Sequence, residues 1–216
     1  MKALNHLLLL CTLLAAGCAS PAGKEPVDYV NPYVGNISHL LVPTFPTVQL
    51  PNAMLRVYPE RADYTSEYVN GLPVIVTNHR ERSAFKLSVT TGSELQPVIP
   101  VTYDNEHLTP YGFDIDLQDG AVHAAYAVSR QSAVYRIRFR DGKGTLLLTS
   151  GNGAVTLDGN LLTGWQLVSG ETKVYVAMEL DVAPAKAGGR LVLEMGPQPN
   201  FSWGRVADTG RIPQEK

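Results

Sequence analysis

Hydrophobic and polar residues alternate along most of this chain, and a period of two is the pattern of a β-strand. The clearest case is the segment 133–140, where Tyr135, Ile137 and Phe139 alternate with three arginines. Because successive side chains of a strand point to opposite faces of its sheet, this segment predicts a half-buried strand. The same reasoning predicts strands at 74–77, 85–90, 98–103, 113–117, 122–129, 145–149, 154–157, 161–168, 173–180 and 191–195.

Turn signals separate these segments. Asn-Gly, Asp-Gly or Ser-Gly dipeptides stand at 70–71, 119–120, 141–142, 152–153, 158–159 and 169–170. Asn-Gly and Asp-Gly readily adopt the positive φ angles of tight hairpins. Four prolines between 40 and 60 predict an extended or looped stretch there. The pattern therefore predicts an all-β, antiparallel fold, either a sandwich or an open barrel.

The first residues have the pattern of a secretory signal. Lys2 is followed by an apolar run and then by Gly17-Cys18, which is typical of a bacterial lipoprotein signal. We therefore expect a signal peptide at 1–17, a lipidated tether at 18–27 that begins with acylated Cys18, and one domain at 28–216. The expected location is the bacterial cell envelope, at the outer membrane or in the periplasm. Ala15 stands where such signals usually have Leu, so plain secretion is the alternative.

Cysteine and charge content exclude two classes of function. The chain has 2 cysteines, one in the leader and one at the expected lipidation position, which leaves none for a disulfide or a cysteine-based zinc site. The formal net charge is −2, and no run of basic residues is present. Nucleic-acid binding therefore has no electrostatic basis in this sequence.

Residues that could carry chemistry are few. The histidines after the leader, His39, His79, His107 and His123, do not have metal-ligand spacing, so we expect no metal site in this chain. We interpret His79 as part of a solvated turn and His123 as a packed or edge residue. No nucleophile or phosphate-binding motif is present.

Two pairs of residues have alternative interpretations. Asp114 and Asp116 could hold a cation, but they also suit a solvated strand face, which we favour. Trp165 and Trp203 could stack on sugars, but tryptophans in a β core are commoner.

The block D-Y-V-N-P-Y-V-G at 28–35 resembles the start of the N-terminal domain of glycoside hydrolase family 92, the bacterial exo-acting α-mannosidases. The segments 45–59, 109–113, 132–139 and 201–204 are similar to later steps of that domain. The glycine-rich loop of the family is largely replaced here by Asn36 to His39. The similarity spans most of the chain after the leader.

The resemblance implies an antiparallel β-sandwich of the supersandwich type that packs against a helical-barrel domain. In the family that barrel carries the catalytic carboxylates, and a calcium ion helps to distort the mannose. Inverting hydrolysis needs two carboxyl groups far enough apart to admit water. The resemblance thus implies a non-catalytic domain that lines the active-site cleft, inactive alone, with mannose-containing glycans and the absent barrel as partners. On this basis Asn36, His39 and Phe45 are the candidates for substrate proximity, with loop packing as the alternative role of His39.

Two other hypotheses stay open. The chain could be a stand-alone surface lipoprotein that binds glycans without hydrolysing them. It could also be a structural lipoprotein whose sandwich pairs with another subunit.

Overall fold

The structure, a computed structural model, describes residues 23–36, 45–61, 65–76, 83–93, 96, 98–169, 171–181, 186–188, 192–195 and 202–207. The chain divides into two compact units, 1–30 and 31–216. In the first unit, Pro26–Tyr29 forms a 3-10 turn, and the Asp28 carboxylate accepts a 2.9 Å hydrogen bond from the backbone amide of Glu25. This turn was not among the sequence predictions. No described helix has the length and apolar character needed to cross a membrane.

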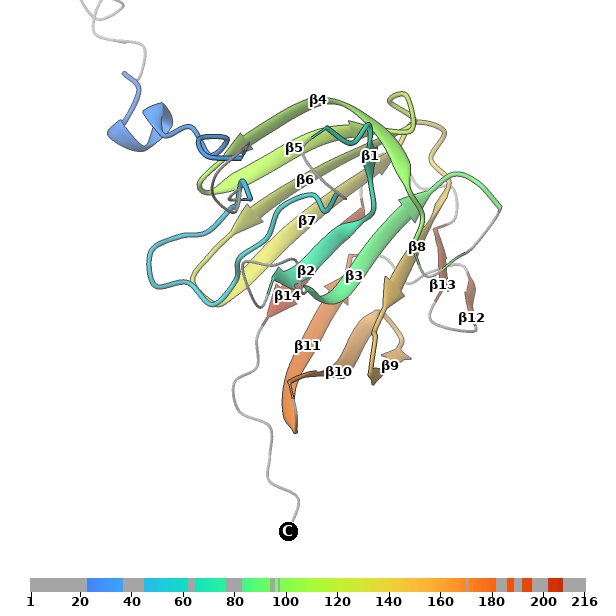
Figure 1. Ribbon diagram of the computed structural model, residues 1–216. Helices are drawn as coiled ribbons and strands as arrows, with labels where there is room; N and C mark the ends of the chain where they lie inside the picture. Colours follow the sequence, from blue (N-terminus) through green and yellow to red (C-terminus); the bar gives the residue numbers. More distant parts are fainter. Residues whose placement is uncertain are drawn as a thin grey trace, which may run out of the picture. The chain divides into compact units, whose positions relative to one another are not determined.

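The second unit is built from antiparallel strands (Figure 1). The described strands are β1 (Tyr68–Val69), β2 (Leu72–Val76), β3 (Ser83–Thr90), β4 (Val101–Thr109), β5 (Gly112–Leu117), β6 (Val122–Val128), β7 (Ser132–Phe139), β8 (Gly144–Thr149), β9 (Gly153–Asp158), β10 (Leu161–Ser169), β11 (Thr172–Leu180), β12 (Lys186–Gly188), β13 (Val192–Met195) and β14 (Ser202–Ala207).

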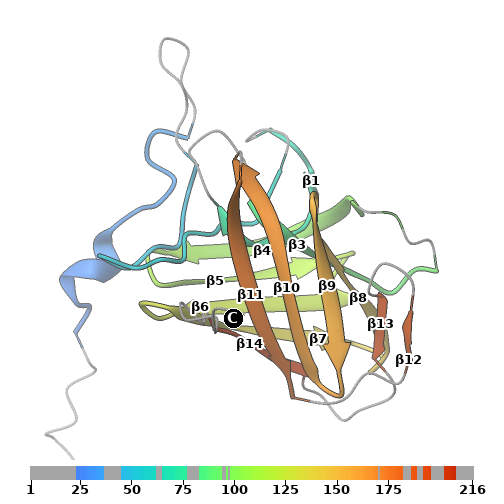
Figure 2. The same cartoon turned by 90° about the horizontal axis from the view of Figure 1, so that it is seen from below.

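These strands form two sheets. The larger has the order β1-β4-β5-β6-β7-β14-β11-β10-β9, and the smaller has the order β12-β13-β8-β3-β2. Strands β9, β10 and β11 lie side by side at one end of the larger sheet (Figure 2). The prediction of an all-β, antiparallel sandwich is confirmed.

Alternation of side chains explains how the two sheets pack. In β7, Tyr135, Ile137 and Phe139 are buried, whereas the arginines between them are half-buried. The inward residues of both sheets join one hydrophobic cluster, to which the smaller sheet contributes Phe85 and Leu148. A leucine-sized side chain contributes about 1.5–3 kcal/mol when it is fully buried, so this shared core is what holds the sheets face to face.

Most predicted strands are present, but some boundaries differ. The strand predicted at 98–103 begins at Val101 and continues to Thr109. The strands β1 and β12 are too short to show a period and were not predicted. The predicted hairpin turn at 119–120 is present, and Gln118, Asp119 and Gly120 all have positive φ angles, of 52°, 53° and 74°. The segment 45–60, predicted to be extended or looped, contains isolated bridges and no regular element among its residues.

Candidate functional site

A β-bulge in β4 creates the most unusual polar arrangement in the described structure. β4 pairs with β5 in register up to Asp104 and again from His107, so Asn105 and Glu106 together lie opposite the single residue Ile115. Asn105 has a φ of 51°, a left-handed conformation that is uncommon outside glycine. Bulges bend a strand and re-aim its side chains, and they are frequent next to functional sites.

The bulge brings Glu106 against Arg61, and the two form a buried ion pair. Arg61 is 5% exposed, and the Glu106 side chain is 9% exposed. Glu106 Oε1 accepts a hydrogen bond from Arg61 Nη2, and Glu106 Oε2 accepts one of 3.2 Å from the Tyr33 hydroxyl. Both carboxylate oxygens therefore have a donor. Tyr33 comes from the opening block of the domain, so this contact ties the opening loop to the bulge.

Tyr103, two residues before the bulged Asn105 in β4, completes the polar arrangement around Glu106. Arg61 Nη1 donates a 3.0 Å hydrogen bond to the Tyr103 hydroxyl, which donates in turn to the carbonyl of Ser66 at 3.2 Å. The Arg61 guanidinium carbon also lies 4.6 Å from the centre of the Tyr103 ring. We call Tyr33, Arg61, Tyr103 and Glu106 the bulge cluster.

The electrostatics of the bulge cluster keep Tyr33 protonated. Burial of the hydroxyl, together with the nearby Glu106 carboxylate, raises the pKa of Tyr33 well above its ordinary value of 10.0. The phenol therefore keeps the proton that it donates to Glu106 even where the pH exceeds its ordinary pKa of 10.0. Arg61 Nε is buried and has no hydrogen-bond partner in the described structure.

Asn36 ends the described part of the opening loop, and its side chain is buried without a partner. The residue is 5% exposed, and neither its Oδ1 nor its Nδ2 has a hydrogen-bond partner in the structure as described. Its backbone amide donates to the carbonyl of Tyr33 at 3.2 Å, and Gly35 before it has a φ of 85°. A buried polar group without a partner costs about 1–3 kcal/mol, so such groups mark places where water or a ligand completes the site.

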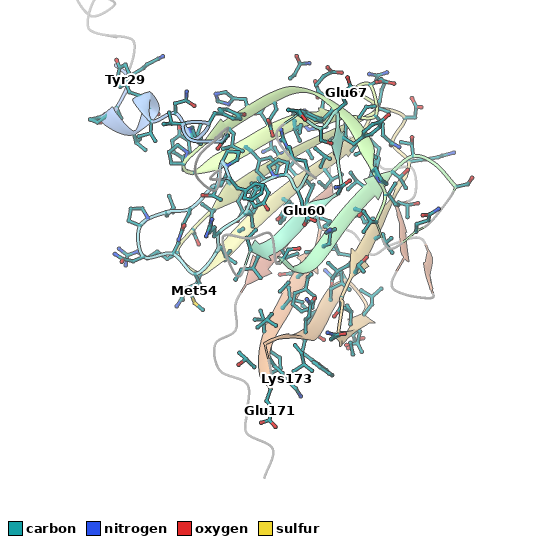
Figure 3. The ribbon with its side chains drawn as sticks, viewed as in Figure 1. Tyr29, Met54, Glu60, Glu67, Glu171 and Lys173 are labelled. Atoms are coloured by element: carbon teal, nitrogen blue, oxygen red, sulfur yellow. The ribbon has the colours of Figure 1, made fainter. Side chains whose placement is uncertain are left out.

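The residue that precedes Arg61 contacts the other sheet. Glu60, labelled in Figure 3, accepts a 2.5 Å ion-pair contact from Lys86 Nζ and a 3.1 Å hydrogen bond from the Ser83 hydroxyl, both in β3. Arg61 instead contacts Glu106 in β4. Adjacent residues of one extended segment therefore bind the smaller and the larger sheet.

The structure describes Phe45 but not His39, the other two candidates for substrate proximity. Phe45 is half-buried and stacks on the buried Tyr58, with ring centres 4.9 Å apart and ring planes at 16°. Asn36 and Phe45 thus flank the stretch 37–44. His39, His79 and Cys18 lie outside the described residues.

The two aspartates on β5 differ in their environment. The Asp114 side chain is 48% exposed and lies 3.4 Å from His107 Nδ1, in agreement with a solvated face. Asp116 accepts hydrogen bonds of 2.9 Å from Asn105 Nδ2 and 2.8 Å from His123 Nδ1. The Asn105 and His123 contacts lower the pKa of the Asp116 carboxyl below its ordinary value of 3.8. His123 is thus a partly exposed partner of Asp116 on the outer face of β6.

The described residues contain no group of three or more His, Cys, Asp or Glu side chains that could hold a metal ion. The calcium ion that the family resemblance implies is one of the complete family enzyme, not of this chain.

Sequence reasoning missed Arg61, Tyr103 and Glu106, and it included Tyr33 only as part of a family block. One signal could have found Glu106, because the alternation of β4 breaks at Asn105-Glu106. Nothing local to Arg61 indicates that it pairs with a residue 45 positions later.

Comparison with known proteins agrees with this architecture. A family model described as the glycosyl hydrolase family 92 N-terminal domain matches residues 29–199. A search of curated proteins finds no match.

Solved structures with the same fold are larger enzymes. An inverting family GH92 mannosidase from Bacteroides thetaiotaomicron superposes with a TM-score of 0.66 at 18% identity, over 88% of this chain and 30% of that chain. A family GH92 alpha-mannosidase from the same organism gives a TM-score of 0.69 at 15% identity, over 85% and 33%. The chain thus spans about a third of the length of these structures.

Proposed function

The chain belongs to the glycosyl hydrolase family 92 N-terminal domain family, and from that premise we propose that it serves as the non-catalytic sandwich domain of an α-mannosidase-like glycoside hydrolase. The reaction is hydrolysis of mannose-containing glycans. The similar structures are described as mannosidases, and this chain spans only about a third of each, which supports a role as one part of a larger enzyme.

The observation that carries the proposal is the buried carboxamide of Asn36. An amide offers two donors and two acceptor positions, which match the hydroxyl groups of a sugar. Tyr33, three residues earlier, is fixed by its hydrogen bond to Glu106. The bulge cluster therefore holds the opening loop in place, and Asn36 contacts the glycan from that loop. Phe45, at the other end of the stretch 37–44, adds an aromatic face.

The described carboxylates support a non-catalytic role. Inverting glycosidases need one carboxyl to protonate the leaving group and another to activate water. Glu106 is the buried carboxylate of this site, and Arg61 and Tyr33 already occupy both of its oxygens. In our proposal the acid and base come from the helical-barrel partner.

Reconstitution tests the proposal. The purified chain is mixed with a separately expressed helical-barrel domain of a family 92 mannosidase, and release of an aryl leaving group from an α-mannoside is followed. We expect no turnover by either part alone and turnover by the mixture. Turnover by this chain alone contradicts the non-catalytic role, and mannoside binding without reconstitution favours the stand-alone glycan-binding lipoprotein.

Substitution of Asn36 tests its contact with the glycan. In the active mixture, Asn36→Ala should lower kcat/KM about tenfold, because about 1.4 kcal/mol of hydrogen bonding to the sugar is lost. The matched control is Asn152→Ala, which removes an exposed carboxamide. Equal kcat/KM for the two variants contradicts the role of Asn36.

We further propose that Cys18 carries the lipid that holds the protein at the cell envelope. Several acyl chains anchor a protein to a bilayer far more firmly than one. Cys18→Ala should move the protein from the membrane fraction to the soluble fraction. Unchanged fractionation contradicts lipid anchoring.

A further inference from the structure

Two aromatic side chains lie side by side on the outer face of β9, β10 and β11, the end of the larger sheet remote from β1. Trp165 of β10 is directly opposite Tyr175 of β11 and directly opposite Ala154 of β9. Directly opposed residues of an antiparallel pair have Cβ atoms about 4.5–5.5 Å apart. Trp165 and Tyr175 are therefore neighbours on one face of the sheet, and we call this pair the aromatic platform.

Tyr175 is the accessible member of the aromatic platform, Trp165 is half-buried, and polar groups border both. Tyr175 is 41% exposed. Lys173, exposed near the β10–β11 turn in Figure 3, places its Nζ 4.3 Å from the centre of the Trp165 ring. Thr163 lies two residues before Trp165 on the same face of β10 and is directly opposite Thr156 of β9. The hydroxyls of these two threonines lie 2.9 Å apart, and both residues are exposed.

The fold does not need these rings for its core. The inward positions of the same strands are filled by Leu162, Val176 and Met178, each at most 5% exposed. Trp165 and Tyr175 alternate with those residues and face the other way. Trp165 and Tyr175 thus lie in one row on the outward face, with the small Ala154 beside Trp165.

The size and chemistry of the surface indicate its occupant. A stable protein interface covers about 800 Å² on each partner, with an apolar centre. Even with the exposed Leu161 at the far end of β10 included, the exposed apolar surface here is only on the order of 200 Å². That area suits one or two sugar rings, whose apolar faces stack on aromatic rings while their hydroxyls bind polar neighbours.

We infer that the aromatic platform binds an oligosaccharide, with a sugar ring stacked on Tyr175 beside Trp165. Lys173 Nζ has three donors, and it holds the indole in place while donating to sugar hydroxyls. The Thr156 and Thr163 hydroxyls bind the neighbouring sugar unit. This site lies on different strands from the bulge cluster, so the inference goes beyond the proposed function and does not rest on it.

Tryptophan fluorescence of the purified chain tests the inference. The chain has 2 tryptophans, so Trp203→Phe leaves Trp165 as the only reporter. Linear α-1,6-mannotetraose and cellotetraose are titrated to about 10 mM, a range that covers weak affinities. We expect a saturable change in Trp165 emission with at least one of the two. Calorimetric titration of the unsubstituted chain measures the same dissociation constant if Trp203→Phe fails to fold.

Substitutions locate the binding. Tyr175→Ala should weaken it about tenfold, the loss expected for one aromatic stacking contact. The matched control is Tyr68→Ala in β1, which removes another exposed tyrosine, 48% exposed, at the opposite edge of the same sheet. Absence of binding by both sugars, or equal weakening by the two variants, overturns the inference.

Discussion

The backbone amide of Phe85 donates a 2.9 Å hydrogen bond to the side-chain oxygen of Gln166, 81 residues later in the chain. Phe85 has a φ of 56°, a conformation that a bulky residue adopts only where the surroundings enforce it. The same oxygen of Gln166 accepts a 3.2 Å bond from the amide of Gly151. One buried carboxamide therefore joins β3 of the smaller sheet to β10 of the larger sheet.

Gln166→Ala should lower the free energy of unfolding by about 2 kcal/mol, because two backbone amides lose their acceptor in a buried place. Urea denaturation followed by circular dichroism measures the change. The control is Thr163→Ala on the exposed face of the same strand, where we expect a change within about 0.5 kcal/mol. Similar midpoints for the two variants contradict a joining role for Gln166.

Arg61→Met should destabilise the domain by about 3–5 kcal/mol, because Glu106 is then left as a buried charge without its cation. The double variant Arg61→Met with Glu106→Leu removes both charges and should regain part of that loss. Denaturant midpoints of the single and double variants give the comparison.

A double variant less stable than Arg61→Met contradicts this account of the ion pair. Glu106→Gln in the otherwise unchanged chain gives a second measurement. It keeps the shape of the side chain, removes its charge and replaces one of its two acceptor oxygens with an NH2 donor, so the loss it causes reports the charge together with one hydrogen bond.

Asp116→Asn should destabilise the domain at pH 7 and have little effect in acid. The folded-state pKa of Asp116 lies below 3.8, so its carboxylate contributes stability above about pH 4 and loses that contribution as the pH falls through the folded pKa. The difference in thermal midpoint between the unsubstituted chain and the variant should therefore shrink toward pH 3. Thermal melts at several pH values measure it, and Asp114→Asn, at a more exposed carboxylate, should show a smaller difference at pH 7.

Gly112→Ala should destabilise the β5–β6 hairpin by about 1–3 kcal/mol. A Cβ at Gly112 would lie 2.6 Å from the backbone carbonyl oxygen of Tyr126, and a backbone atom in a ladder cannot move aside cheaply. Gly23→Ala is the control, because a Cβ there meets no atom within 4 Å. Equal thermal midpoints for the two variants contradict this close approach.

The sequence predicted the fold well because the information needed was local. In β7, alternation of apolar residues with arginine specifies both the strand and its buried face, and the turn at Asp119-Gly120 is specified by its own residues. The family block at 28–35 indicated the sandwich type and agreed with the matched family model.

The candidate site was predicted only in part, because its contacts are long-range. Asn36 was named as a candidate through the family resemblance and stays a prediction, and the structure shows that it is buried. Arg61 and Glu106 are far apart in sequence, and they meet only because the bulge at Asn105 turns Glu106 away from the position that strict alternation would give it. A period of two cannot predict a residue that departs from that period.

Glu60 and Arg61 have a mechanical consequence for the sandwich. Glu60 forms an ion pair with Lys86 of the smaller sheet, and Arg61 forms an ion pair with Glu106 of the larger sheet. Sliding of the two sheets past each other would stretch a single peptide unit between two charged contacts. The segment therefore resists shear at the position where the opening loop is attached, and a force applied to Tyr33 is transmitted to both layers.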